Sequence, residues 1–330
     1  MIASSPMQET SWLRRRGWEL AVWIAVPVCV TLLFPDYFVL ASQISAAALF
    51  VLSLDLLVGY AGLLSLGHAV FFGLGAYTAG LISKGGWSEP ISALLAAGLV
   101  AGLVGYVTGF VVVRVRHLAQ LMVTLGIGLL VFEGASRMRG VTGGDDGLQG
   151  MSISPLLGVF PFDLYGHAAF AYAFGVLAIC FVVMTRIIDS PFGLTLQGLR
   201  DNPHRMAAIG TPGSARLRKA YTIAAVFAGI AGGLLAQTTQ FVALETLSFH
   251  LSAEVLIMLV LGGAGYRYGG LVGAAVYMIA RDWLSDLNPE FWQLGVGAVM
   301  VLVVLFAPDG VLGGVNGLIK RFGRARQEQP

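Results

Sequence analysis

The sequence predicts an all-α polytopic membrane protein with about ten transmembrane helices, some of them short or broken at glycines. Hydrophobic residues make up 57% of the 330 residues and charged residues only 12%, whereas soluble domains carry about 25% charged residues. The mean hydropathy is +0.80. The apolar residues are also gathered into segments of the length that crosses a bilayer, for which about 20 residues are needed.

Ten apolar segments are candidate spans. In chain order they are Trp18–Phe34, Phe38–Val58, Gly62–Ile82, Ile91–Val113, Leu118–Phe132, His167–Ile188, Ala220–Phe241, Ala253–Gly263, Gly270–Leu284 and Phe291–Ala307. The eighth and ninth are short and flank the sequence GGAGYRYGG, whose glycines interrupt a continuous helix. One long interrupted helix is the alternative, and it would leave nine spans.

Lys and Arg residues predict the orientation, because cytoplasmic loops of membrane proteins are enriched in them. With Arg14–Arg16 on the cytoplasmic side, ten spans leave only a small share of the 20 Lys and Arg residues outside, namely Lys84, Arg137, Arg139 and Arg281. Nine spans would instead place the basic C-terminal tail outside. We therefore expect ten spans with both termini in the cytoplasm, and we expect the first span to be retained rather than cleaved as a signal peptide.

This topology divides the chain into five stretches. They are a cytoplasmic tail at 1–17, the first membrane helices at 18–188 with an external loop at 137–166, a cytoplasmic loop at 189–219, the remaining membrane helices at 220–307 and a basic cytoplasmic tail at 308–330.

The cytoplasmic loop contains the sequence GLRDNPHRMAAIGTPGSARLRKA, which predicts a short amphipathic helix at Pro203–Ile209. Pro203 suits the first turn, with Asp201 or Asn202 as N-cap, and Gly210 suits the position that ends the helix. The helix can anchor the loop at the membrane surface, where Arg216, Arg218 and Lys219 would meet anionic headgroups. Alternatively it can dock into a groove on a soluble partner.

Several function classes lack their sequence signals. No G-x-x-x-x-G-K-[ST] motif is present, so we expect the chain not to hydrolyse ATP in the manner of P-loop proteins. No nucleophile–base or acid–base set stands out, so we expect a non-enzymatic chain without a cofactor. Cys29 and Cys180 lie within apolar runs and are expected to be small buried hydrophobic residues. An ion-coupled secondary transporter is a rival, but it would place ionisable residues at mid-membrane, where this chain has almost none.

Four polar residues are candidates for a translocation path: Asp55, Tyr60, Ser65 and His68. Asp55 lies near the cytoplasmic end of the second span, where it either reaches interfacial water, lines the path or forms a hydrogen bond between helices. His68 is expected to form an interhelical hydrogen bond or to face the pore. Around it the small residues Gly62, Ala69, Gly73, Ala76 and Gly80 share one face of the expected third span.

Two other carboxylates are expected to have structural roles. Glu133 is placed to pair with Arg137 four residues later. Glu254 is placed at the start of the eighth span, where a negative charge favours the helix dipole.

The cytoplasmic loop resembles the coupling loop of permease subunits in the ABC importers for branched-chain amino acids, and five further motifs support the resemblance in the right order. They are LLVGYAGLLSLGHAVFFGLGAYTAG, VTGGDDGLQG, AGIAGGLLAQ, LVLGGAGYRYGGLVGAAV and LFAPDGVLGG, which together with the loop cover most of Leu40–Gly314. The chain is most similar to the LivM-type permease of this family. Permeases for urea or short-chain amides are a closely similar alternative. Asp55 departs from the pattern, which leads us to expect Asn at that position.

The resemblance implies a permease subunit of an ATP-driven importer for branched-chain or related hydrophobic amino acids in the bacterial inner membrane. Its partners would be a second related permease subunit, two cytoplasmic ATP-binding subunits, a periplasmic binding protein and membrane lipid, with no nucleic acid. The residues expected to couple to the ATPase are Arg200, Asp201, Asn202, Arg205, Ala207, Ala208 and Gly210.

The external motif is expected to dock the binding protein or to shape the outer mouth. Its residues are Thr142, Gly143, Gly144, Asp145, Asp146 and Gly147. The adjacent carboxylates lack the spacing of a calcium-binding loop, so no metal is expected.

Overall fold

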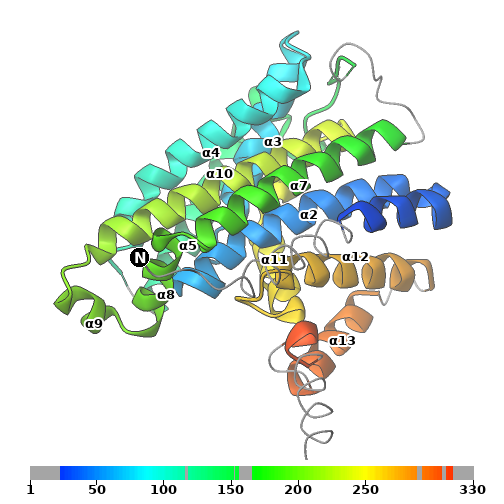
Figure 1. Ribbon diagram of the computed structural model, residues 1–330. Coiled ribbons are helices and arrows are strands. Elements are labelled where there is room, and N and C mark those ends of the chain that lie inside the picture. The colour runs from blue at the N-terminus through cyan, green and yellow to red at the C-terminus, as the bar shows by residue number, and fades with distance from the viewer. Residues whose placement is uncertain are drawn as a thin grey trace, which may run out of the picture.

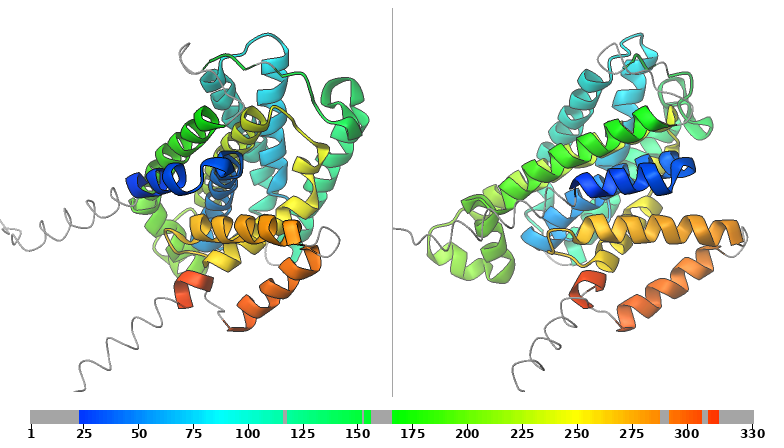
Figure 2. Two further views of the ribbon diagram at one scale, coloured as in Figure 1. Left: turned by 90° about the vertical axis from the view of Figure 1, so that its right-hand side faces the viewer. Right: turned by 45° about the vertical axis from the view of Figure 1, so that its right-hand side comes forward.

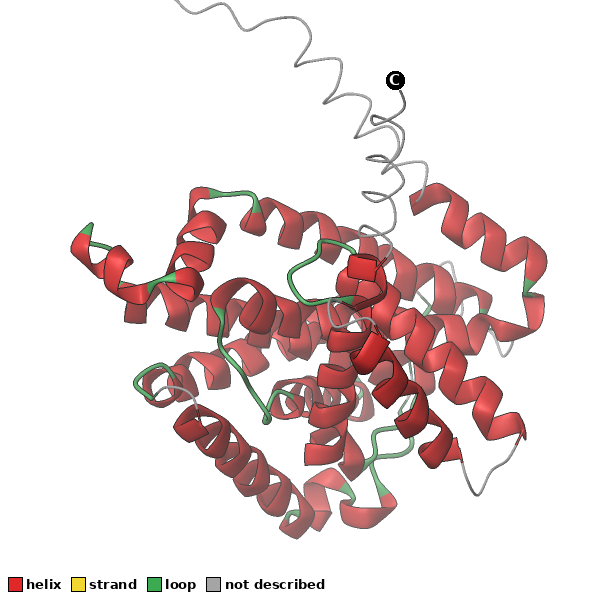
Figure 3. Ribbon diagram, turned by 90° about the horizontal axis from the view of Figure 1, so that it is seen from below, coloured by secondary structure: helices red, strands yellow, loops and turns green. Residues whose placement is uncertain are grey.

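The chain folds into a bundle of helices, and the part that the structure describes contains no strand beyond one isolated bridge (Figures 1 and 3). The computed structural model describes residues 23–115, 118–151, 153–155, 166–287, 292–306 and 310–314. An apolar helix at Trp23–Leu33 is followed by η1 (Pro35–Tyr37), α2 (Phe38–Asp55), the π-helix η2 (Leu56–Ala61), α3 (Ala69–Lys84), α4 (Pro90–Val112), α5 (Leu118–Arg137), α6 (Arg139–Thr142), η3 (Gly144–Asp146), α7 (His167–Ile188), α8 (Pro191–Asp201), α9 (Pro203–Ala208), α10 (Gly213–Thr239), η4 (Leu244–Leu247), α11 (Phe249–Gly262), α12 (Gly269–Leu287) and α13 (Trp292–Phe306).

Helices α2 and α10 form the centre of the bundle. In the most apolar part of each helix, 83% of the residues are buried in α2 with η2 and 72% in α10. In α5, at the periphery, only 11% are buried. Helix α2 is apolar around its whole circumference, as expected of a buried helix. Helix α10 packs against α2, α3 and α4, and Figure 1 shows α2, α7 and α10 running side by side. Figure 2 shows α7 along one face of the bundle from two further sides.

Small residues bring α3 and α10 into backbone contact. A Cβ atom added to Gly75 would lie 2.1 Å from the carbonyl oxygen of Gly229, and one added to Gly232 would lie 1.8 Å from that of Phe72. Without a side chain at these positions the two backbones approach closely, which is how helices associate in membranes.

The structure confirms the all-α polytopic membrane fold. Within the described part of the chain, five helices are long and apolar enough to cross a bilayer by themselves: Phe38–Ala61, Pro90–Val112, Leu118–Arg137, His167–Ile188 and Gly213–Thr239. Three shorter apolar helices, at Trp23–Leu33, Ala69–Lys84 and Phe249–Gly262, lie among them. The segments expected as the eighth and ninth spans form separate helices, α11 and α12, rather than one interrupted helix.

The expected start of the third span is wrong. The third span begins at Ala69 instead of Gly62, because residues 62–68 leave the helical path after η2, so Gly62 does not share the face of the small residues in α3. Helix α10 begins at Gly213, before the expected start of the seventh span at Ala220. Arg216, Arg218 and Lys219 therefore lie in its first turns.

The two carboxylates with expected structural roles have different outcomes. Glu133 pairs with Arg137 at 2.8 Å, as expected. The expectation for Glu254 is wrong, because α11 begins at Phe249 and its N-cap is Ser248. Glu254 therefore lies beyond the first turn, where the helix dipole has little effect. Cys180 is buried as expected, whereas the expectation for Cys29 is wrong, because it is exposed on the described part of the bundle. Residues 1–22 and 315–330, with most of both expected tails, lie outside the described residues.

Candidate functional site

Two short helices, α8 and α9, connect α7 to α10. Ser190 caps α8 by accepting a hydrogen bond from the backbone N–H of Gly193, with Pro191 at the first helical position. Asn202, one of the two expected N-caps, accepts from the backbone N–H of Arg205 at 2.9 Å and so begins α9. The helix expected at Pro203–Ile209 is present, whereas α8 was not anticipated, although the Ser190–Pro191 pair is a start signal for it.

Gly210 ends α9 as the sequence predicts. Its φ is +80°, a conformation that glycine adopts without strain. Its N–H donates to the carbonyl of Ala207 at 3.0 Å, and the N–H of Thr211 donates to the carbonyl of Met206 at 3.0 Å. This pair of bonds is the Schellman motif, which satisfies the last carbonyls of a helix.

Helix α9 projects from the bundle, and none of its residues is buried. The residues expected to couple to a partner are exposed throughout: Arg200, Asp201, Asn202, Arg205, Ala207, Ala208 and Gly210. The apolar Ile209 at the end of α9 is 70% exposed. In contrast, α8 buries Gly193, Leu196 and Leu199 against the bundle. Figure 1 shows both helices at one end of the molecule, beside the end of α2. The α8–α9 segment therefore has a part that packs on the bundle, α8, and an exposed part, α9, which we call the free tip.

Arg200 connects this segment to the membrane bundle. Its Nη1 donates a hydrogen bond to the carbonyl oxygen of Gly59 in η2, and its Nε lies 3.3 Å from the carboxylate of Asp201. A π-helix shifts the regular pairing of backbone groups and is frequent at functional sites. Among the expected coupling residues, Arg200 is thus the one that reaches into the bundle while the others stay on the surface.

Asp55 ties the end of α2 to the turn between α11 and α12. Its side chain is 1% exposed, and its Oδ1 accepts a hydrogen bond from the backbone N–H of Gly265 at 2.8 Å. The interpretation that Asp55 reaches interfacial water is therefore wrong, and the structure supports the alternative of a hydrogen bond between elements. Gly59 lies between the two groups, because a Cβ there would be 2.1 Å from Asp55 Oδ1 and 2.5 Å from Gly265 N.

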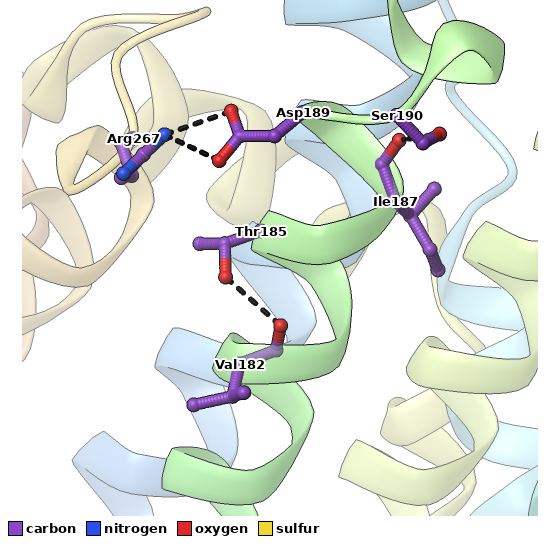
Figure 4. Close-up of polar contacts among 6 residues, drawn as sticks. All are labelled: Val182, Thr185, Ile187, Asp189, Ser190 and Arg267. Carbon is purple, nitrogen blue, oxygen red and sulfur yellow. Dashed lines mark hydrogen bonds and ion pairs between the residues drawn. The ribbon is translucent and has the colours of Figure 1, made fainter. Parts of the chain in front are cut away.

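An ion pair joins the same turn to the start of the α8–α9 segment. Nη2 of Arg267 donates to Oδ1 and Oδ2 of Asp189 at 2.8 and 2.7 Å (Figure 4). Asp189 is the residue that ends α7. The α8–α9 segment is thus attached to the bundle at both ends of α8, through Asp189 to the α11–α12 turn and through Arg200 to η2.

A cavity of about 570 Å³, which we call the inner cavity, lies where the α8–α9 segment meets the bundle. It is lined by Gly62 and Leu63 after η2, by Gln120 of α5, by His204 of α9 and by Leu217 of α10. Nε2 of Gln120 is buried without a hydrogen-bond partner among the described residues. The cavity therefore borders both the free tip and the non-helical segment 62–68.

The remaining path candidates, Tyr60, Ser65 and His68, are buried and do not line this cavity. His68 is fully buried, and its Nε2 lies 2.9 Å from Ser53 Oγ, the interhelical hydrogen bond that the sequence suggested. Its ring stacks on Phe50 at 5.5 Å. Tyr60 and Ser65 are also buried. The structure thus places all four candidates in the interior but does not gather them into one cluster.

Non-helical backbone around Ser65 is held by side chains from other helices. The N–H of Leu66 donates to Thr124 Oγ1 at 3.2 Å, and the N–H of Ala69 donates to Ser252 Oγ at 3.0 Å. Irregular backbone at membrane depth needs such internal partners, because lipid offers none. Thr124 and Ser252 are functional candidates that sequence reasoning missed, and no local signal marks them.

The loop that the sequence predicts to be external contains a polar turn, which lies at the opposite end of the bundle from α9 (Figure 1). Thr142 Oγ1 donates to the carbonyl of Ala135 at 2.7 Å and accepts from the N–H of Gly144 at 3.2 Å. Gly143, Gly144 and Gly147 all have positive φ. Asp145 and Asp146 are exposed.

Leu148, just after this turn, pairs with Val242 in an isolated antiparallel bridge. The bridge joins the loop to the segment between α10 and α11. Among the described residues no group of three His, Cys, Asp or Glu side chains is placed to hold a metal ion.

Known proteins resemble this chain over most of its length. A family model described as the branched-chain amino acid transport system / permease component matches residues 37–304. The high-affinity branched-chain amino acid transport system permease protein LivM of Salmonella typhimurium is 31% identical over 304 residues, which are 84% of this chain and 70% of that protein. The Escherichia coli LivM protein is 31% identical over 305 residues, with the same shares. No solved structure matches the chain.

Proposed function

The chain belongs to the family of permease components of branched-chain amino acid transport systems, and we propose how it works as a subunit of such an ABC importer. It is a multi-pass membrane protein that contributes to the pathway for branched-chain amino acids. In the proposal it lies in the bacterial inner membrane with α9 on the cytoplasmic side. ATP is hydrolysed by separate subunits that bind there.

The assembly that we propose contains four kinds of subunit. This chain pairs with a second, related permease; two ATP-binding subunits meet the α9 tips; and a periplasmic binding protein delivers the amino acid to the opposite end, near the Thr142–Gly147 turn. The exposed surface of α9 supports this arrangement, because a small helix with Ile209 70% exposed beside Asp201 and Arg205 suits a groove on a soluble partner.

The observation that carries the mechanism is the double attachment of α8. A force on α9 reaches the bundle at the Asp189–Arg267 ion pair and at the hydrogen bond from Arg200 to Gly59. Both lead to the place where Asp55 joins η2 to the α11–α12 turn. Closure of the ATP-binding subunits would therefore shift η2 and the adjoining segment 62–68, which is the irregular backbone beside the inner cavity.

Transport by the reconstituted complex tests this function. Liposomes containing the complex, with binding protein and labelled leucine outside and ATP inside, are expected to accumulate leucine only while ATP is hydrolysed. Sodium and proton gradients, applied without ATP, are the control. Accumulation by this chain alone on an ion gradient would overturn the proposal in favour of a secondary transporter.

A further inference from the structure

A second cavity, of about 380 Å³, lies among α2, α10, α11, α12 and α13. It is bordered by the segment that follows Val242, the residue that pairs with Leu148 after the external turn. It therefore lies toward the end of the bundle opposite α9. Figure 1 shows α9 and the C-terminal end of α12 on opposite sides of the molecule. Its volume is within the range of about 300–1,000 Å³ that is usual for small-molecule sites.

We call this second cavity the outer cavity. One of its walls carries side chains of opposite charge. Glu254 of α11 is 7% exposed, and its Oε2 lies 3.8 Å from Nη1 of Arg281 in α12. Glu254 Oε1 accepts a hydrogen bond from Tyr277 at 3.2 Å and lies 3.4 Å from His250 Nε2. The guanidinium of Arg281 also lies 5.0 Å from the ring centre of Trp292. Ionisable side chains in membrane helices are costly and mark substrate pathways more often than ordinary packing.

The opposite walls are apolar. Phe50 and Phe72 line the cavity and stack at 4.4 Å, and Met258 and Met278 complete the apolar lining. Phe50 also stacks on the buried His68, so the apolar lining of the cavity continues into the buried interior of the bundle. The cavity thus combines a cation, an anion and an apolar surface, which are the three features that a free apolar amino acid presents in complementary form.

We propose that the outer cavity binds a branched-chain amino acid as its zwitterion, with the α-carboxylate on Arg281, the α-ammonium on Glu254 and the side chain against Phe50 and Phe72. At 3.8 Å, the Glu254–Arg281 pair is longer than a hydrogen bond, so inserting the zwitterion replaces one loose contact by two charge-assisted hydrogen bonds. This inference rests on the proposed function, since it assigns a site to its substrate. The pathway then holds its substrate on the side where the binding protein releases it.

Cysteine protection tests the site directly. The full complex of permeases and ATP-binding subunits, without binding protein, is placed in nanodiscs with Cys29→Ala, Cys180→Ala and a single Ala47→Cys in the cavity wall. L-leucine is expected to slow the reaction of Ala47→Cys with a small thiol reagent. A Ser214→Cys variant, at the inner cavity, is the matched control and is expected to react at an unchanged rate.

Analogues and variants identify the contacts. 4-Methylpentanoate lacks the ammonium and isoamylamine lacks the carboxylate, so each is expected to protect at least about tenfold more weakly than leucine. Glu254→Gln and Arg281→Gln are expected to raise the protecting concentration of leucine by at least about tenfold, and Arg281→Lys by less, because Lys keeps the charge. A merely structural Glu254–Arg281 tie would change thermal stability without changing the preference among the three compounds.

The outcomes separate the site from the function. If ATP-driven leucine uptake occurs but leucine does not protect Ala47→Cys, or all three compounds protect it equally, the site is wrong and the importer function stands. If leucine protects as expected but no ATP-driven uptake occurs, the proposed function is wrong. Should Glu254→Gln fail to assemble, Tyr277→Phe removes one hydrogen bond to the same carboxylate with little change of shape, and an unchanged protecting concentration in it would count against the site.

Discussion

Both carboxylate oxygens of Asp189 accept hydrogen bonds from Nη2 of Arg267, although 78 positions separate the two residues. The pair joins the end of α7 to the turn between α11 and α12, directly before the helix α8 that seats the projecting α9. It is partly exposed, with 39% of the Arg267 and 55% of the Asp189 side chain accessible. Such pairs add only about 0–1 kcal/mol to stability, so its value lies in the connection that it makes.

Breaking this pair is expected to uncouple transport more than it destabilises the protein. In Arg267→Ala we expect an unfolding temperature close to that of the unmodified complex and a clear fall in leucine imported per ATP hydrolysed, because motion of α8 no longer reaches the α11–α12 turn. The reversed pair, Asp189→Arg with Arg267→Asp, should recover part of the ratio. An unchanged ratio in Arg267→Ala would show that the pair does not transmit the motion.

Loss of charge at the free tip is expected to weaken binding of the ATP-binding subunits. In the double variant Asp201→Ala, Arg205→Ala both side chains are exposed, so folding should be unaffected while co-purification and uptake fall. Asp145→Ala, which removes an exposed carboxylate on the Thr142–Gly147 turn, is the matched control. Retention of the ATP-binding subunits and of the original uptake rate in the double variant would remove the docking role from α9.

A variant of the N-cap residue Asn202 tests whether a preformed α9 is needed, without changing the charge of the surface. Asn202→Ala removes the acceptor for the Arg205 N–H and should cost the helix about 0.5–2 kcal/mol. We expect weaker binding of the ATP-binding subunits, measured by titration of the purified permease pair. Asn202→Asp keeps an acceptor and is expected to bind almost normally. Equal affinities for the two variants would mean that α9 need not be preformed.

Gly59 is expected to tolerate no side chain. A Cβ at this position would lie 2.1 Å from Asp55 Oδ1 and 2.5 Å from Gly265 N, so Gly59→Ala should destabilise the bundle by about 1–3 kcal/mol through overpacking. Gly126→Ala is the control, since nothing lies within 4 Å of its Cβ position. Thermal unfolding in detergent measures both, and equal unfolding temperatures would contradict the close junction at η2.

Asp55 is expected to act as a hydrogen-bond acceptor rather than through its charge. Asp55→Asn keeps an oxygen that can accept from Gly265 N and should preserve both stability and uptake, in line with the Asn that the family resemblance leads us to expect. Asp55→Leu leaves a buried N–H without its partner, at a cost of about 1–3 kcal/mol. If Asp55→Asn instead abolished uptake while remaining folded, the charge itself would be required.

The sequence was sufficient to predict those helices and helix ends that depend on residues within a few positions of one another. The apolar runs predicted the bundle, and Asn202, Pro203 and Gly210 predicted α9 with its ends, because capping and backbone preference act within a few residues. The expected pairing of Glu133 with Arg137 followed from helical spacing in the same way. The start of the third span was misjudged at Gly62 because the apolar run continues through residues 62–68. In the structure Gly62 ends η2 with a φ of +69°, and Thr124 and Ser252 hold the backbone that follows.

By itself the sequence determined that the chain is a membrane-embedded helical bundle with a short capped helix in its polar middle segment, since hydrophobicity and capping are properties of short stretches. Only the tertiary structure decided that Asp55 meets Gly265 across 210 positions, that Arg200 meets Gly59 across 141, and that Glu254 and Arg281 face one cavity. The apolar helices are chemically alike, so their sequences leave open which of them become neighbours. The close packing of small residues such as Gly75 against Gly229 selects one arrangement, and that arrangement brings the distant polar groups together.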